Sequence, residues 1–99
     1  MGTEEVRIQL RLYVSPGSPN STVALRNLET ICKRHLADRV DLEVVDLYEE
    51  PSRALEDGVM MTPMLVLASL DPPVRIIGNL NDPAPVLQAL EVVPGDYAD

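Results

Sequence analysis

The sequence predicts a single α/β domain with four strands and three helices, in the order strand, helix, strand, helix, strand, strand, helix. Three observations lead to this prediction. Apolar and polar residues alternate from Val6 to Val14, which is typical of a strand. The apolar spacing then becomes helical from Asn20 to Leu36. The length of 99 residues provides for one hydrophobic core and no more.

The first half of the chain predicts two parallel strands joined by a long helix. In the first strand Arg7, Gln9, Arg11 and Tyr13 alternate with the apolar residues, which predicts one buried face. Pro16 and Gly17 end this strand, and Ser18 or Asn20 is the candidate N-cap of the helix. A second strand over Leu42–Leu47 is expected to be parallel to the first, because the helix makes the crossover. The helix has a broad stripe facing the core: Ala24, Leu25, Leu28, Ile31, Cys32, His35 and Leu36.

A short helix and a buried strand come next. The helix is predicted over Pro51–Asp57, since proline suits the first helical position and Gly58 suits the residue just past the end. The strand is predicted over Met64–Leu70, where the residues are apolar nearly throughout, as in a strand buried on both faces. The sequence Asp71-Pro72-Pro73 then makes a turn.

The last two elements are a fourth strand and a third helix. The strand covers Val74–Ile77 and is closed by Gly78. The helix is predicted over Pro83–Val93, with Asp82 as its cap, because prolines in a first turn cost no hydrogen bond. The sequence Pro94-Gly95 terminates it.

A Thr-Pro step, Thr62-Pro63, opens the third strand. A thioredoxin-like fold has this order of elements and carries a cis proline at this place, facing the loop after its first strand. We therefore expect a cis bond before Pro63, facing the loop from Ser15 to Ser21. In that loop the segment Ser18–Ser21 occupies the slot of a redox C-x-x-C pair. Because disulfide exchange needs a thiolate, the sequence excludes a dithiol oxidoreductase.

Composition narrows the class of protein further. With no Phe and no Trp, the core must be aliphatic, and no apolar run is long enough to cross a membrane. The acidic start of the chain does not resemble a secretory signal, so we expect a cytoplasmic protein. The net charge of −8 is uneven, because residues 41–99 contain twelve acidic and two basic side chains. This charge argues against nucleic acid and anionic membranes as partners, and it would steer the chain toward a basic partner surface.

No residue pattern predicts a catalytic, cofactor or metal site. His35 has no Cys or His partner nearby, and we expect it to end the long helix. Cys32 lies on the apolar stripe and is expected to be a small buried hydrophobe. The acidic residues around the short helix predict a solvated face: Glu49, Glu50, Glu56 and Asp57. Three methionines are expected to fill the core, although methionine also suits adaptable interfaces: Met60, Met61 and Met64.

Several motifs resemble the KaiB family of circadian clock proteins, and they occur in family order from about residue 6 to residue 93. The most specific is the block Pro72-Pro73-Val74-Arg75 close before Ile76-Ile77-Gly78-Asn79-Leu80. The others are Leu12-Tyr13-Val14, Pro19-Asn20-Ser21 with Ala24-Leu25, Val45-Asp46-Leu47, Pro51, Leu55-Glu56-Asp57 and Thr62-Pro63.

The resemblance implies a binding protein without enzymatic activity or cofactor. Members of this family adopt two folds that share the first half of the chain, and two such packings must differ by only a few kcal/mol. The ground state is usually a tetramer with a rearranged second half. The thioredoxin-like monomer binds a KaiC-type ATPase hexamer, competes with a sensor histidine kinase and sequesters a KaiA-type protein. The residues assigned to structure or to the switch are Thr62, Pro63, Pro72, Pro73, Gly78 and Ala89.

The sequence departs from the family pattern at a few positions. Clock members typically carry glycine where Ala89 stands, and glycine inside a helix costs about 0.5–1 kcal/mol relative to alanine. Ala89 therefore favours the thioredoxin-like monomer. Clock members also tend to be basic at the positions of Val23, Glu43 and Leu67, which weakens the case for a KaiA-type partner. Two alternatives are a KaiB-like adaptor locked in the thioredoxin-like state outside a clock, in stress or signalling, and an input module of a sensor kinase.

The expected docking surface lies in the second half of the domain, which spans residues 1–99 with disordered tails at 1–5 and 95–99. Exposure and charge select four residues around the short helix and one on the fourth strand. They are Tyr48, Glu49, Pro51, Arg53 and Arg75.

Overall fold

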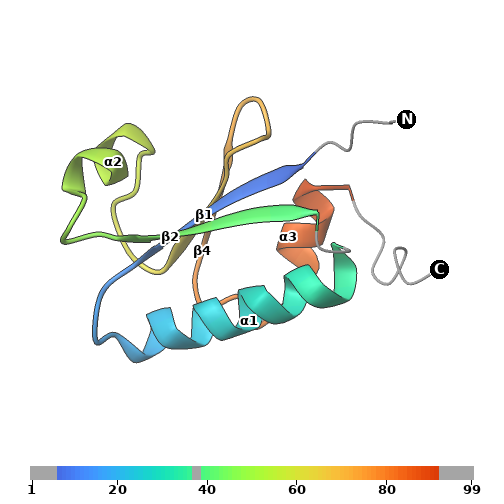
Figure 1. Ribbon diagram of the computed structural model, residues 1–99, viewed down its shortest axis with the longest axis horizontal. Coiled ribbons are helices and arrows are strands. Elements are labelled where there is room, and N and C mark those ends of the chain that lie inside the picture. Colours follow the sequence, from blue (N-terminus) through green and yellow to red (C-terminus); the bar gives the residue numbers. More distant parts are fainter. Residues whose placement is uncertain (1–6, 37–38, 92–99) are drawn as a thin grey trace.

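The computed structural model describes residues 7–36 and 39–91, and it contains the predicted elements in the predicted order (Figure 1). The expected tails at 1–5 and 95–99 lie outside the described residues. The elements are β1 (Ile8–Val14), α1 (Pro19–His35), β2 (Val40–Asp46), α2 (Pro51–Glu56), β3 (Met64–Leu67), β4 (Val74–Ile77) and α3 (Ala84–Ala89).

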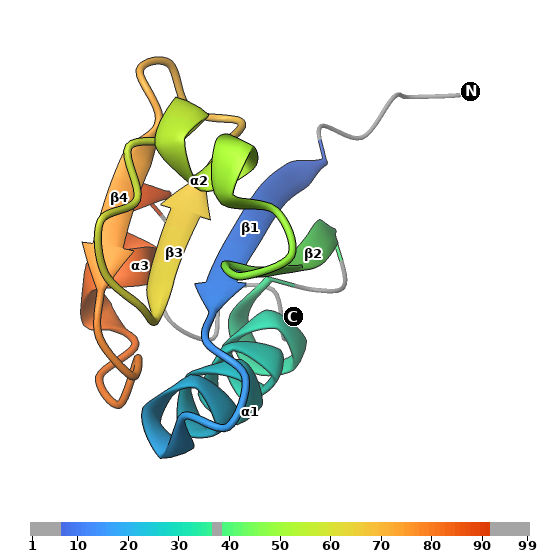
Figure 2. The same cartoon turned by 90° about the vertical axis from the view of Figure 1, so that its left-hand side faces the viewer.

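The four strands form one mixed sheet in the order β2-β1-β3-β4. Strand β1 pairs with β2 in parallel, as predicted, and with β3 in antiparallel fashion, while β3 and β4 are antiparallel. Leu12 marks the register, since it lies opposite Val44 on one side and Leu65 on the other. Helices α1 and α3 cover one face of the sheet and α2 covers the other (Figures 1 and 2).

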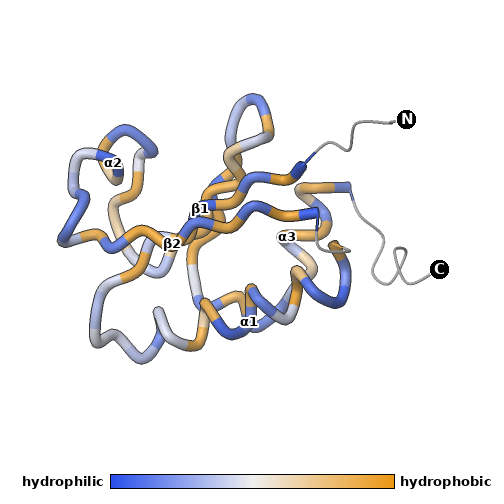
Figure 3. The backbone as a smooth tube through the Cα atoms, in the orientation of Figure 1, coloured by the Kyte–Doolittle hydropathy of each residue, from blue (hydrophilic) through white to orange (hydrophobic). Residues whose placement is uncertain are grey.

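Two apolar clusters lie on the two faces of this sheet. The larger cluster lies under α1 and α3 and is aliphatic, as the composition predicts. The smaller cluster lies under α2. Hydrophobic and hydrophilic residues alternate along β1 (Figure 3), and this alternation divides its side chains between the two faces. The members of the smaller cluster are Tyr13, Val45, Ala54, Val59, Met64 and Val66.

The second face of β1 corrects the sequence-based prediction of a single buried face. Tyr13 is completely buried and Arg11 is half-buried, because α2 covers this side of the strand. Alternation along one strand cannot reveal that a helix 40 residues later will cover its polar face.

Other boundaries differ in ways that the local hydrogen bonds explain. Helix α1 begins at Pro19, and Ser18 is its N-cap, accepting a hydrogen bond from the Ser21 N–H at 3.3 Å. Strand β3 ends at Leu67 instead of Leu70, since Leu70 turns back to bond the Leu67 carbonyl. Strand β2 begins at Val40, which lies opposite Ile8 in the parallel ladder.

Helix α3 is shorter than the predicted span of Pro83–Val93. It ends at Ala89, and Glu91 adopts a left-handed conformation with φ of 58°. The remainder of the predicted span, including Val93, lies outside the described residues. The N-cap position is held by Pro83 instead of the expected Asp82, although the Asp82 carboxylate accepts a hydrogen bond from the Ala84 N–H at 3.0 Å.

The cis bond predicted before Pro63 is confirmed, and a second cis bond precedes Pro72. Thr62 also faces the loop after β1 as predicted, since its hydroxyl lies 2.5 Å from that of Ser15. Among residues 7–36 and 39–91, no helix has both the length and the apolar character needed to cross a membrane.

Shortening a leucine to alanine should affect the free energy of unfolding differently in the core and on the α2 surface. Leu28 in α1 is completely buried, whereas Leu55 in α2 is 80% exposed. We expect Leu28→Ala to lower the free energy of unfolding by about 2–5 kcal/mol, because it removes packed methyl groups and leaves a cavity. The matched change Leu55→Ala should cost less than about 0.5 kcal/mol. Urea unfolding followed by circular dichroism measures both, and equal losses would contradict the assignment of the core.

Candidate functional site

Helix α2 is held on the sheet by little apolar contact. Ala54 is its one buried residue, and Val59 adds a second buried side chain just after the helix. Burial of these two small side chains is a modest apolar contribution, and polar contacts add to it. Those contacts centre on Asp57, the residue at the C-terminal end of α2.

Asp57 forms a partly buried cluster with two side chains of β1. Arg11 donates two hydrogen bonds to the Asp57 carboxylate at 2.8 and 3.0 Å. The Tyr13 hydroxyl donates to the same carboxylate at 2.5 Å, and its oxygen lies 3.1 Å from the Arg53 carbonyl oxygen. Both strand residues therefore bind the C-terminal end of α2, which fixes the helix over β1.

The ionisation of this cluster follows from its contacts. The hydrogen bonds from Arg11, with a further one from Tyr13, lower the pKa of Asp57. The same pairing raises the pKa of Arg11. Burial, together with the bond to Asp57, raises the pKa of Tyr13 to about 12. At neutral pH the cluster therefore holds one carboxylate, one guanidinium and one neutral phenol.

Two more arginine side chains near α2, those of Arg53 and Arg75, form hydrogen bonds within the chain. Arg53 donates hydrogen bonds to Glu43 on β2, one of them at 2.7 Å, and forms a second ion pair with Glu50. The bond between Arg53 and Glu43 raises the pKa of Arg53 and lowers that of Glu43. Arg75 on β4 donates a hydrogen bond to the Asp57 carbonyl oxygen.

Gly58 leaves room for the close approach of Arg75. A Cβ atom at Gly58 would lie 3.1 Å from two nitrogens of the Arg75 guanidinium, and the φ of this glycine is 71°. Only glycine adopts that conformation at little cost, so the residue suits both the turn and the close contact. Arg75 is in this way held against the end of α2.

The structure brings the five expected docking residues to the α2 side of the sheet. Tyr48 and Glu49 form the turn into α2, Pro51 is its first residue, and Arg53 lies within it. Arg75 reaches the same side from β4. Tyr48 is 72% exposed, whereas the guanidiniums of Arg53 and Arg75 are engaged as described above.

Four exposed apolar residues on this side were not among the expected docking residues. Leu55 is 80% exposed, Met60 90%, Met61 54% and Ile77 59%. The expectation that the methionines fill the core is confirmed for Met64 and is wrong for Met60 and Met61. The alternative interpretation of methionine, as part of an adaptable surface, was the signal in the sequence that applied to them.

The loop that carries Met60 and Met61 is tied to β4 at both ends. The Asp57 carbonyl accepts the bond from Arg75, and the Pro63 carbonyl accepts one from the Gly78 N–H at 3.1 Å. Figure 2 shows this loop running from α2 along β4 to the start of β3. The two ties hold Met60 and Met61 beside the end of β4, where Ile77 lies.

The slot of a redox pair contains hydroxyl groups with structural roles. Ser18 caps α1, and the buried Ser21 hydroxyl accepts a hydrogen bond from the Ser15 N–H at 3.1 Å. Neither residue is a thiol, so this loop offers no group for disulfide exchange. Within the described part of the chain, no three metal-ligating side chains lie close enough to hold a metal ion.

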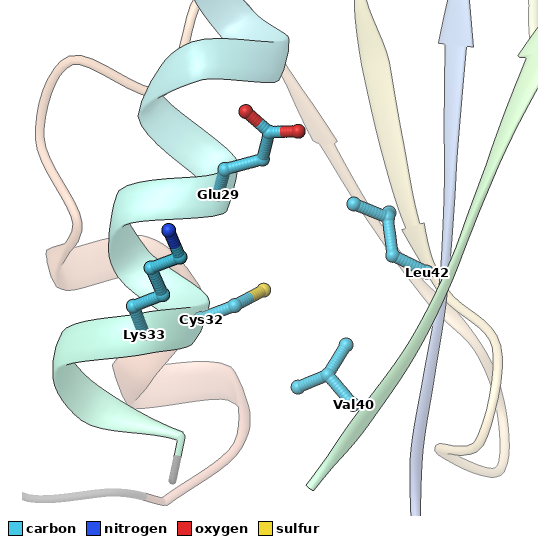
Figure 4. A pocket seen from close by; sticks show the side chains of 5 residues that line it. All are labelled: Glu29, Cys32, Lys33, Val40 and Leu42. Carbon is cyan, nitrogen blue, oxygen red and sulfur yellow. The ribbon is translucent and has the colours of Figure 1, made fainter. Parts of the chain in front are cut away.

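Cys32 lies beside a hollow on the opposite side of the sheet from α2. This hollow measures about 450 Å³ and opens between α1 and the edge strand β2 (Figure 4). The Cys32 sulfur points toward it, and the residue is partly buried against the larger cluster, so the expectation of a small buried hydrophobe is confirmed only in part. The lining residues are Glu29, Cys32, Lys33, Val40 and Leu42.

Comparison with known proteins gives a consistent result. A family model described as "KaiB domain" matches residues 11–92. The circadian clock protein KaiB3 of Synechocystis sp. is 42% identical over 89 residues, which cover 89% of this chain and 86% of that protein. The circadian clock oscillator protein KaiB of Gloeothece citriformis is 38% identical over 100% of this chain and 93% of its own length.

Solved structures of low identity show the fold. Thioredoxin 1 from Thermosipho africanus superposes with a TM-score of 0.67 at 20% identity, covering 84% of this chain and 90% of that chain. Mitochondrial thioredoxin 3 from Saccharomyces cerevisiae gives a TM-score of 0.68 at 18% identity, covering 85% and 76%. The predicted thioredoxin-like fold is confirmed.

The Asp57 cluster should make stability depend on pH in a defined direction. The pKa of Asp57 is lower in the folded chain than the value of about 3.9 in an unfolded one. Its contribution is therefore present above about pH 4 and is lost as the pH falls through the folded pKa. We expect Asp57→Asn to lower the free energy of unfolding by about 1–3 kcal/mol at pH 7. The difference from the native chain should shrink below about pH 4.

Urea unfolding between pH 3 and pH 7 measures this difference. The matched control is Glu56→Gln, which removes a neighbouring exposed carboxylate without an ion pair among the described residues. We expect the control to behave like the native chain at each pH. A loss in Asp57→Asn that stays constant from pH 7 to pH 3 would exclude an ionic origin.

Proposed function

The chain belongs to the KaiB family, and from this premise we propose that it is a non-catalytic clock-type adaptor that binds a KaiC-type ATPase hexamer. One observation carries the proposal. The α2 side exposes several large apolar side chains, and exposed apolar side chains gathered on one side of a domain are typical of protein interaction sites. They are Tyr48, Leu55, Met60, Met61 and Ile77.

The proposed docking surface combines these apolar groups with the residues expected from the sequence. Tyr48 is the proposed anchor, because exposed tyrosine is often a binding hot spot. Glu49 and Pro51 border it at the start of α2. Arg53 and Arg75 complete the surface, and their bonds to Glu43 and to the Asp57 carbonyl keep α2 in one position for the partner.

The proposal includes the thioredoxin-like monomer as the binding state, competition with a sensor histidine kinase, and capture of a KaiA-type protein. The family resemblance supports these partners. A tetramer would accompany the alternative ground-state fold. Ala89 is the last residue of α3, so it supports the thioredoxin-like state less than the interior position expected from the sequence, where glycine would cost about 0.5–1 kcal/mol.

A second candidate function is an adaptor of the same fold that acts outside a clock. It is favoured by the ion pair of Glu43 with Arg53, since clock members tend to be basic at the position of Glu43. In this chain the Glu43 side chain is bonded to Arg53 of α2 and helps to hold that helix. Direct binding to a KaiC-type hexamer separates the two candidates.

Backbone amide NMR tests the proposed function. We expect stoichiometric KaiC-type hexamer with ATP to abolish most amide signals soon after mixing, because the chain joins a large complex. Tyr48→Ala should weaken binding by about tenfold or more, since it removes the proposed anchor. The control Val44→Ala shortens a side chain of β2 that is 44% exposed on the α1 side, and should leave affinity unchanged. Unchanged native spectra would favour the second candidate.

The same proposal predicts no disulfide reductase activity. Insulin reduction by dithiothreitol should proceed at its uncatalysed rate in the presence of the chain, because Ser18 and Ser21 hold the positions of the redox thiols. A thioredoxin serves as the positive control in the turbidity assay. Turnover that disappears in Cys32→Ser would show that this lone thiol acts as a catalyst, contrary to the proposal.

A further inference from the structure

We infer that the partner segment docking on the α2 side is apolar and bordered by lysine or arginine side chains. This inference rests on the proposed docking function and adds the chemistry of the partner. It follows from the position of the exposed apolar side chains and from the charges that surround them. The apolar part is called the docking strip here, and consists of Leu55, Met60, Met61 and Ile77.

The docking strip is held in place although its side chains are exposed. Its loop is bonded to β4 through Arg75 at one end and Gly78 at the other. A strip fixed in this way loses little conformational entropy on binding, which favours affinity. The methionine side chains within it remain adaptable, so the strip suits an apolar segment of irregular shape.

The charges around the strip are unequal. On α2, in the turn before it and among the side chains bonded to it, five carboxylates lie beside three guanidiniums. The guanidiniums are already bound, since Arg11 pairs with Asp57, Arg53 with Glu43 and Glu50, and Arg75 with a carbonyl. The carboxylates are Glu43, Glu49, Glu50, Glu56 and Asp57.

Two of these carboxylates are available to a partner. Glu49 and Glu56 have no ion pair among the described residues, and both are exposed. Each directly follows an exposed apolar residue, Tyr48 or Leu55. A partner that covers those apolar side chains therefore brings its own groups close to Glu49 and Glu56. Complementary cations there would be attracted, whereas carboxylates would be repelled.

The same charge argues against a second copy of this chain as the occupant. In a two-fold symmetric dimer the same patch faces itself, so the unpaired Glu49 and Glu56 of both copies would be drawn together. Phosphate-rich partners face the same repulsion. A cationic, apolar protein segment meets both requirements of the surface.

Affinity measurements with a KaiC-type hexamer and ATP test the inference, using paired variants with equal changes in net charge. Glu49→Lys with Glu56→Lys should weaken binding by about tenfold or more at low salt, mainly through slower association. The control Glu29→Lys with Glu91→Lys adds the same four charges at exposed sites on α1 and after α3, and should stay within about twofold of native. Binding of the native chain should weaken as salt rises.

The apolar half has its own test. Met60→Ala with Met61→Ala should weaken binding about tenfold at every salt concentration, whereas Val44→Ala should have no effect. Circular dichroism checks that each variant is folded, since the changed side chains are exposed. Native binding that neither variant pair reduces would overturn the inference and leave the docking function standing. Stronger binding of the lysine pair would also overturn it, and absence of native binding would overturn both proposals.

Discussion

The arrangement of the α2 side depends on one carboxylate, Asp57. Its two bonds from Arg11 and one from Tyr13 join the end of α2 to the middle of the sheet. Because these bonds add to the burial of Ala54, α2 is held without turning Leu55 inward. On the inner side of the helix Ala54 is buried and Asp57 is bonded to β1, and Leu55 is left on the outer side. The proposed docking surface exists for that reason.

Much of the fold could be predicted from the sequence because its signals are local. Alternation predicted β1, the candidate cap Ser18 placed the start of α1 to within one residue, and the Thr62-Pro63 step predicted the cis bond. The ends of β3 and α3 were overestimated, since apolar residues continue past the last ladder or helical bond. The ends of a strand or helix depend on where its hydrogen-bonding partners end. A hydrophobic pattern contains no information about those partners.

The candidate site could be predicted less completely, for a related reason. Residues of the turn into α2 lie together because they are adjacent in sequence, so Tyr48, Glu49 and Pro51 were accessible to reasoning. The exposure of Met60 and Met61 depends on ties to β4 that join residues far apart in the chain, such as Arg75 to Asp57. The burial of Tyr13 likewise depends on a residue 44 positions away. Exposure is a tertiary property, and the local sequence pattern assigned these three residues to the wrong environment.

The absence of tryptophan from this sequence gives the tyrosines a further significance. The ultraviolet emission of the chain comes from tyrosine alone, and the two tyrosines among the described residues lie in opposite environments. Tyr13 is buried beneath α2, whereas Tyr48 is exposed to solvent just before the start of that helix. Tyr13 emission therefore reports on the packing of α2 against the sheet, and Tyr48 emission reports on a partner that covers the start of this helix. Neither measurement needs an added label.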